Sequence, residues 1–126
     1  MDPLVQLVNK KLLVTQFFDA VQSQDVIGVI PAENIRDAEM ILSIVAEASS
    51  GAKGRVVAVY AFGDSSGVRI EAKGEGEEWS PIGRLTGPAV LIIPRATIKH
   101  VEERVPEVWR KVVATLTYHR GIIQIQ

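Results

Sequence analysis

The sequence contains no cysteine, which excludes a disulfide scaffold, a zinc site built on thiolates and a cysteine nucleophile. Aromatic residues are scarce at 6%, and there are two histidines, so neither a large stacking surface nor a histidine-rich metal site is favoured. The net charge of −1 gives no general attraction to nucleic acid or anionic lipid. Apolar runs are short, whereas a membrane helix needs about 20 residues. We therefore expect no metal, no cofactor and no membrane contact.

The remaining composition is that of an ordinary folded domain. Hydrophobic residues make up 47% of the 126 residues and charged residues 23%, close to the average for globular proteins. No linker or repeat divides the chain, so we predict a single domain over 1–126. An acid at Asp2 argues against a signal peptide, and together with the lack of cysteine it favours a cytoplasmic location.

Apolar periodicity and turn signals predict helices and strands along the whole chain. Asp2-Pro3 and Asn34 are good helix starts, whereas Pro106 should kink or restart the helix in which it lies. The predicted helices cover 4–21, about 34–48 and 96–109. The predicted strands cover 25–30, 55–62, 68–73, 89–93, 111–118 and 122–126.

Two predicted hairpins, over 55–73 and 111–126, favour an α+β fold. We expect a mostly antiparallel sheet of about five or six strands, with two or three helices packed on one side of it. The first helix carries a wider apolar stripe than one contact with a sheet requires. Either this helix is deeply buried, or part of it faces another chain.

Two short patterns resemble parts of enzyme active sites. Gly63–Gly67 resembles the Gly-Asp-Ser-Gly-Gly stretch of chymotrypsin-like proteases, but Ser66 replaces a glycine and no histidine precedes Asp64. Glu71–Lys73 resembles the Glu-x-Lys element of metal-dependent PD-(D/E)xK nucleases, but the preceding strand, 55–62, carries no acid. A turn and a solvated strand face explain both patterns. We therefore predict that the chain is not an enzyme.

Other candidate ligand sites are incomplete. The acids near His100 are Glu102 and Glu103, and His119 has none beside it. A metal site needs three or four ligands that converge, so no metal site is predicted. The loop Gly74–Glu78 is rich in glycine but acidic, and its carboxylates would repel a phosphate. Trp79, which follows this loop, could anchor it on a partner.

The basic residues gather in the last third of the chain. Over 81–126, lysine and arginine outnumber aspartate and glutamate, whereas acids dominate over 1–80. Cations beside an aromatic residue are the combination that binds single-stranded nucleic acid, so RNA or single-stranded DNA is a candidate partner. The candidate nucleic-acid-binding residues are Arg110, Lys111, Tyr118 and Arg120.

The same third is similar in its order of elements to the C-terminal end of archaeal tRNA-splicing endonuclease subunits. The segments that follow this pattern are Leu91–Pro94, a helix, Arg110-Lys111, Val112–Tyr118 and Ile122–Gln126. The resemblance implies that Lys111 takes the position of a functional lysine in that family. The catalytic tyrosine and histidine of the family have no counterpart before the Pro94 strand, so the resemblance implies a non-catalytic subunit.

Contact with another macromolecule is the predicted role. The apolar surplus of the first helix and a last strand that could lie at a sheet edge both favour protein–protein contact. We therefore predict a non-catalytic assembly or accessory module that forms a homo- or hetero-oligomer. The alternative is a nucleic-acid-binding accessory protein, such as a non-catalytic subunit of an RNA-processing complex. The predicted interface residues are Leu13, Phe17, Ile122 and Ile125.

Overall fold

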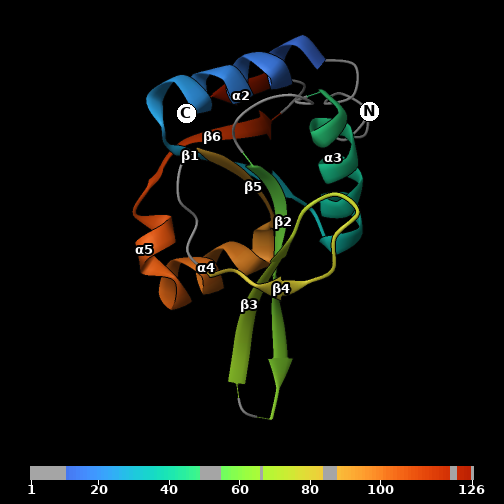
Figure 1. The fold of residues 1–126 in the computed structure, drawn as a ribbon, viewed down its shortest axis with the longest axis vertical. Helices are drawn as coiled ribbons and strands as arrows, with labels where there is room; N and C mark the ends of the chain where they lie inside the picture. The colour runs from blue at the N-terminus through green and yellow to red at the C-terminus, as the bar shows by residue number, and fades with distance from the viewer. Residues whose placement is uncertain (1–10, 49–54, 66, 84–87, 120–121, 126) are drawn as a thin grey trace.

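The computed structural model of the chain contains one sheet with helices packed on it (Figure 1). It describes residues 11–48, 55–65, 67–83, 88–119 and 122–125. The helices are α2 (Lys11–Gln24), α3 (Ile35–Ala48), α4 (Arg95–Arg104) and α5 (Pro106–Trp109). The strands are β1 (Ile27–Ala32), β2 (Arg55–Asp64), β3 (Gly67–Lys73), β4 (Ser80–Pro81), β5 (Ala89–Pro94), β6 (Val112–His119) and β7 (Ile122–Ile125).

The sheet is mixed, and within the described residues it has seven strands in the order β4-β3-β2-β5-β1-β6-β7. The four central strands β2, β5, β1 and β6 are parallel to one another. The hairpins β2–β3 and β6–β7 add antiparallel strands on both sides, and β4 pairs with β3. The predicted α+β fold is confirmed, and both hairpins lie where the sequence predicts them.

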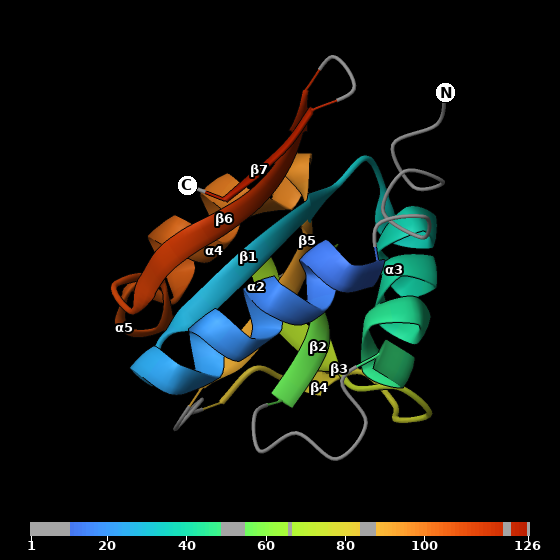
Figure 2. The same ribbon diagram turned by 90° about the horizontal axis from the view of Figure 1, so that it is seen from above.

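Helices cover both faces of the sheet, so the prediction that they cover one side is wrong. The connection from β1 through α3 to β2 and the connection from β5 through α4 and α5 to β6 run in opposite directions along the sheet. Because crossovers between parallel strands are right-handed, opposite directions place the helices on opposite faces. Figure 2 shows α2 and α3 on one face and α4 and α5 on the other.

The central strands are buried on both faces, and their side chains alternate between two cores. On β5, Val90 and Ile92 pack with α2 and α3, whereas Leu91 and Ile93 pack with α4 and α5. All four side chains are 0% exposed, and burying each contributes about 1.5–3 kcal/mol. The continuous apolar run of this strand therefore reflects a core on each side of the sheet.

Asp25 and Val26, which the sequence pattern assigns to the next strand, form the cap at the end of α2. Asp25 has a positive φ of 54°, and its N–H donates to the carbonyl of Gln22 at 3.2 Å. The N–H of Val26 donates to the carbonyl of Val21 at 3.2 Å. This pair of bonds is a Schellman cap, with Asp25 at the left-handed position. The strand β1 therefore begins at Ile27 instead of Asp25.

Phe17 is a core residue, so its predicted position at an interface is wrong. Its side chain is 1% exposed, and with Val21 it packs directly on the backbone of Gly28 in β1. A Cβ atom built on Gly28 would lie 2.6 Å from Cζ of Phe17. The absence of a side chain at Gly28 is what admits the ring. Leu13 also lies in α2, but its side chain is outside what the structure describes.

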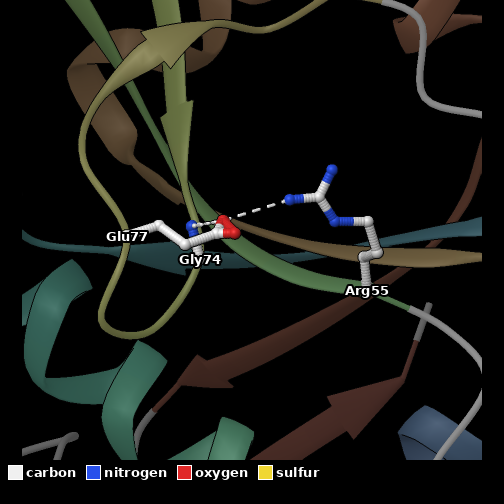
Figure 3. Close-up of polar contacts among 3 residues, drawn as sticks. All are labelled: Arg55, Gly74 and Glu77. Atoms are coloured by element: carbon white, nitrogen blue, oxygen red, sulfur yellow. Dashed lines mark hydrogen bonds and ion pairs between the residues drawn. The ribbon is translucent and has the colours of Figure 1, made fainter.

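The acidic loop after β3 folds back on its own hairpin. A carboxylate oxygen of Glu77, Oε1, accepts the N–H of Gly74 at 3.1 Å and pairs with Nη2 of Arg55 at 3.2 Å (Figure 3). Trp79 then packs edge-on against Phe62, with ring centroids 5.3 Å apart. The tryptophan that the sequence analysis considered as an anchor for a partner thus contacts the hairpin of its own chain.

Candidate ligand-binding crevice

The carboxyl ends of β1 and β5 meet at one end of the sheet, where their connections leave in opposite directions. β1 leads to α3 on one face and β5 leads to α4 on the other. In sheets with parallel strands, the crevice outside such a pair of strand ends is the usual position of a ligand site. A crevice of about 450 Å³ lies there, within the size range of small-molecule sites.

The far half of β2 forms one wall of this crevice. Its pairing with β5 ends at Ala58, opposite Ile92, although β2 continues to Asp64 with β3 alone beside it. Among the described strands, no other one covers the free edge of β2 beyond Ala58. Tyr60 lines the crevice and is half-buried, and its ring makes an edge-on contact with Phe62 at 5.1 Å. The wall therefore combines backbone groups with a fixed aromatic ring.

The helices α3 and α4 both begin at the crevice, but they begin differently. At α3, Oδ1 of Asn34 accepts the N–H of Asp37 at 2.9 Å, which is an ordinary N-cap. At α4, Pro94 occupies the capping position and no side chain caps the helix. The first turn of any α-helix has N–H groups without intrahelical partners, and at α4 the residues Ala96 and Thr97 line the crevice. The positive end of α4 therefore faces it.

Thr97 is a buried residue that places a hydroxyl group at this helix start. Its side chain lies in the core layer, with 4% of the residue exposed, and no hydrogen bond joins its hydroxyl to any residue that the structure describes. No described side-chain nitrogen or oxygen is both inaccessible and unpartnered. The hydroxyl must therefore retain access to solvent, and the crevice that Thr97 lines provides it. His100, one turn later, lines the same space.

An ion pair lies at the rim of the crevice. Nε of Arg95, the first residue of α4, is 3.4 Å from Oε1 of Glu33, which follows β1. The two side chains are 50% and 62% exposed, so this pair contributes only about 0–1 kcal/mol to stability. Its consequence is local: the rim carries one cation and one anion, and Glu33 also lines the crevice.

Two of the four predicted nucleic-acid-binding residues, Arg110 and Lys111, lie at the opposite end of the central strands. Arg110 and Lys111 are exposed, and the carbonyl of Lys111 accepts the N–H of Ile27 at the start of β1. Tyr118 lies in β6, but its side chain is outside what the structure describes, and Arg120 lies outside the described residues. Most of the length of β6 therefore separates Lys111 from Tyr118, and nucleic-acid binding by these four residues stays a prediction.

The predicted interface residues Ile122 and Ile125 lie in β7, whose side chains are also outside the described part. β7 is an edge strand and pairs with β6. The last strand therefore lies at a sheet edge, as the sequence analysis considered. Contact of Ile122 and Ile125 with another chain stays a prediction.

The described ranges contain neither a cluster of metal ligands nor a membrane-spanning helix. No group of three or more histidine, aspartate and glutamate side chains there could hold a metal ion. None of the helices in those ranges has the length and hydropathy that a bilayer crossing requires. No protein-family model, curated protein or solved structure matches the chain. The likeness of its last third to splicing endonuclease subunits gains no support from these comparisons.

Sequence reasoning missed the crevice because its residues come from four separate segments. The usable signal was the pair of strand-to-helix junctions at Pro31–Asn34 and Pro94-Arg95, each of which follows a buried apolar strand. Two such junctions point to a ligand site when the strands are parallel neighbours, and the sequence alone does not show that they are.

Proposed function

We propose that this chain is a non-catalytic binding module that holds a small ligand in the crevice at the carboxyl ends of β1, β5 and β2. The observation that carries the proposal is the position of the crevice at the point where the crossovers change direction. Its size suits a small molecule, and it is lined by a backbone edge, a helix start and the residue Thr97.

The ionisable groups of the crevice favour binding over catalysis. General acid–base catalysis needs a proton donor or acceptor that a neighbouring group positions. Glu33 forms an ion pair with Arg95. Among the described residues, no carboxylate forms a hydrogen bond or an ion pair with His100. We therefore propose that the module recognises its ligand and does not transform it.

A fragment screen followed by amide chemical shifts in NMR tests this proposal. We expect bound fragments to shift amides in 33–35, 60–63 and 94–100, and to leave those of 26–28 unchanged. Ala96→Trp should fill the crevice and abolish these shifts, because Ala96 lines it and is itself exposed. Glu102→Trp, at an exposed position of the same helix, is the matched control. Shifts confined to other surfaces, or no shifts at all, would contradict the proposal.

The edge strand β7 favours a second candidate, a module that binds a protein partner or a second copy. An edge strand offers unpaired N–H and C=O groups to a strand of another chain. Light scattering at micromolar concentration tests self-association, and Ile125→Lys should dissociate an oligomer built on this edge. A monomer would contradict self-association through β7.

Nucleic acid is the alternative partner, and it is supported by the adjacent exposed side chains of Arg110 and Lys111. Titration with single-stranded RNA at two salt concentrations tests it, because phosphate contacts make affinity depend on salt. A cytoplasmic location also belongs to the proposal and rests on the absence of cysteine from the sequence.

A further inference from the structure

We propose that the crevice recognises a phosphomonoester, with the phosphate at the start of α4 and the organic part of the ligand against Tyr60. This inference rests on the proposed function, because it names the class of ligand that the same crevice takes. It draws on two independent features of the structure, an uncapped helix start and the hydroxyl of a buried threonine that no described residue hydrogen-bonds.

The first feature is the start of α4. This helix is ten residues long, and Pro94 gives it no side-chain cap. Its first N–H groups can donate to an anion, and the aligned peptide dipoles favour negative charge at that end. Helix starts of this kind bind phosphate in many proteins. The neighbouring helix α3 has its own cap in Asn34, so the anion is expected at α4.

The second feature is the hydroxyl of Thr97. A threonine that is 96% buried usually has a hydrogen-bond partner for its hydroxyl within the protein. Here the residue is 4% exposed, lines the crevice and has no hydrogen-bond partner among the described residues. A ligand oxygen beside the first turn of α4 would accept a hydrogen bond from this hydroxyl and from the nearby backbone N–H groups together.

The surrounding side chains favour a phosphate monoester over a carboxylate. A terminal phosphate has three acceptor oxygens, and backbone N–H groups, the Thr97 hydroxyl and the imidazole of His100 can each donate to one of them. The ring of Tyr60 borders the same space and offers an apolar face to the organic part. A volume of about 450 Å³ has room for a ligand with both parts.

Glu33 opposes an anion in this site, and this opposition makes the proposal testable. Its carboxylate lines the crevice and pairs with Arg95 at 3.4 Å. Replacing it by glutamine removes a like charge and releases Arg95 from its partner. Glu33→Gln should therefore tighten phosphomonoester binding by about fivefold at low salt.

The test is an NMR titration of the full chain with inorganic phosphate, AMP and adenosine. We expect phosphate and AMP to shift the amides of Ala96 and Thr97, with AMP binding more tightly than either phosphate or adenosine. Thr97→Val keeps the shape of the side chain but loses the hydroxyl, and it should weaken AMP binding about tenfold or more. Thr97→Ser should restore binding, and Thr115→Val, on β6, is the matched control and should bind as the parent chain does.

The outcomes separate this inference from the proposed function. If adenosine binds as tightly as AMP and phosphate shifts nothing, the inference is wrong and the binding module stands. If a single-stranded oligonucleotide without terminal phosphates matches AMP at the same amides, a phosphodiester replaces the monoester and the inference is again wrong. If Thr97→Val binds AMP as the parent chain does, the hydroxyl is not part of the site. If neither these compounds nor the fragment screen shifts any crevice amide, the proposed function itself fails.

Discussion

The two ends of the parallel strands differ in how many of the backbone N–H and C=O groups there form hydrogen bonds within the fold. At the amino ends, backbone bonds join neighbouring segments: the N–H of Val26 donates to Val21, that of Ile27 to Lys111 and that of Ala89 to Val26. At the carboxyl ends, β2 runs past β5 and α4 begins without a side-chain cap. Backbone groups that are satisfied internally stabilise the fold, and groups left open can bind a ligand. We therefore expect substitutions at the amino ends to change stability, and substitutions at the carboxyl ends to change binding.

The largest expected effect is at the amino ends. Phe17→Ala should lower the free energy of unfolding by about 3–5 kcal/mol, because it leaves a cavity in the core over β1. Urea denaturation measures this loss. Met40→Ala, at a position that is 47% exposed on α3, is the control and should change stability by less than about 0.5 kcal/mol. A loss of similar size for both variants would show that Phe17 is not part of the core.

Gly28→Ala should cost about 1–3 kcal/mol, since the new Cβ would lie 2.6 Å from Cζ of Phe17 and 2.7 Å from Cγ2 of Val21. The same substitution at the carboxyl end, Gly63→Ala, meets nothing within 4 Å and should be nearly neutral for stability. Thermal unfolding of the two variants compares the two ends with one chemical change. Equal shifts in melting temperature would remove the distinction between them.

Asn34 lies at the carboxyl end of β1, but its side chain is used by the fold, because its oxygen caps α3 at 2.9 Å. Asn34→Ala should therefore lower stability by about 1 kcal/mol. Asn34→Asp keeps an acceptor at this position and should restore most of the loss. Chemical denaturation of the three proteins measures both changes. If the alanine variant is as stable as the parent chain, the cap does not contribute to the fold.

The smallest expected change in stability is for Arg110→Glu combined with Lys111→Glu. Both side chains are exposed, so the free energy of unfolding should change by less than about 0.5 kcal/mol, and binding in the crevice should be unaffected. Titrations of the double variant and the parent chain with AMP and with single-stranded RNA measure the two affinities. A loss of RNA binding alone would favour nucleic acid as the partner of this end, whereas a loss of AMP binding would contradict a site at the other end.

Local sequence patterns predict the elements of this fold better than their arrangement. The continuous apolar run at 89–93 and the alternation at 68–73 correspond to β5 and β3 within one residue at each end. The two-residue strand β4 was not predicted, because so short a segment has no periodicity. The parallel centre was not predicted either, since β5 inserts between β1 and β2 through contacts distant in the sequence.

The candidate site was harder to predict than the fold. Glu33, Tyr60 and Thr97 are separated by many residues, and they meet because β1, β5 and β2 are neighbours in the sheet. No neighbouring residue in the sequence distinguishes Thr97. Its burial, and the absence of a described hydrogen-bond partner for its hydroxyl, are properties of the folded chain alone. Arg110 and Lys111, in contrast, are conspicuous in the sequence because two adjacent cations form a recognisable pattern.

A crystal structure of the chain grown with AMP tests the central claim most directly. The account predicts electron density for AMP between the ends of β1 and β5, with a phosphate oxygen within about 3.2 Å of the Thr97 hydroxyl. An AMP molecule bound beside Arg110 and Lys111, with the crevice holding water, would contradict it.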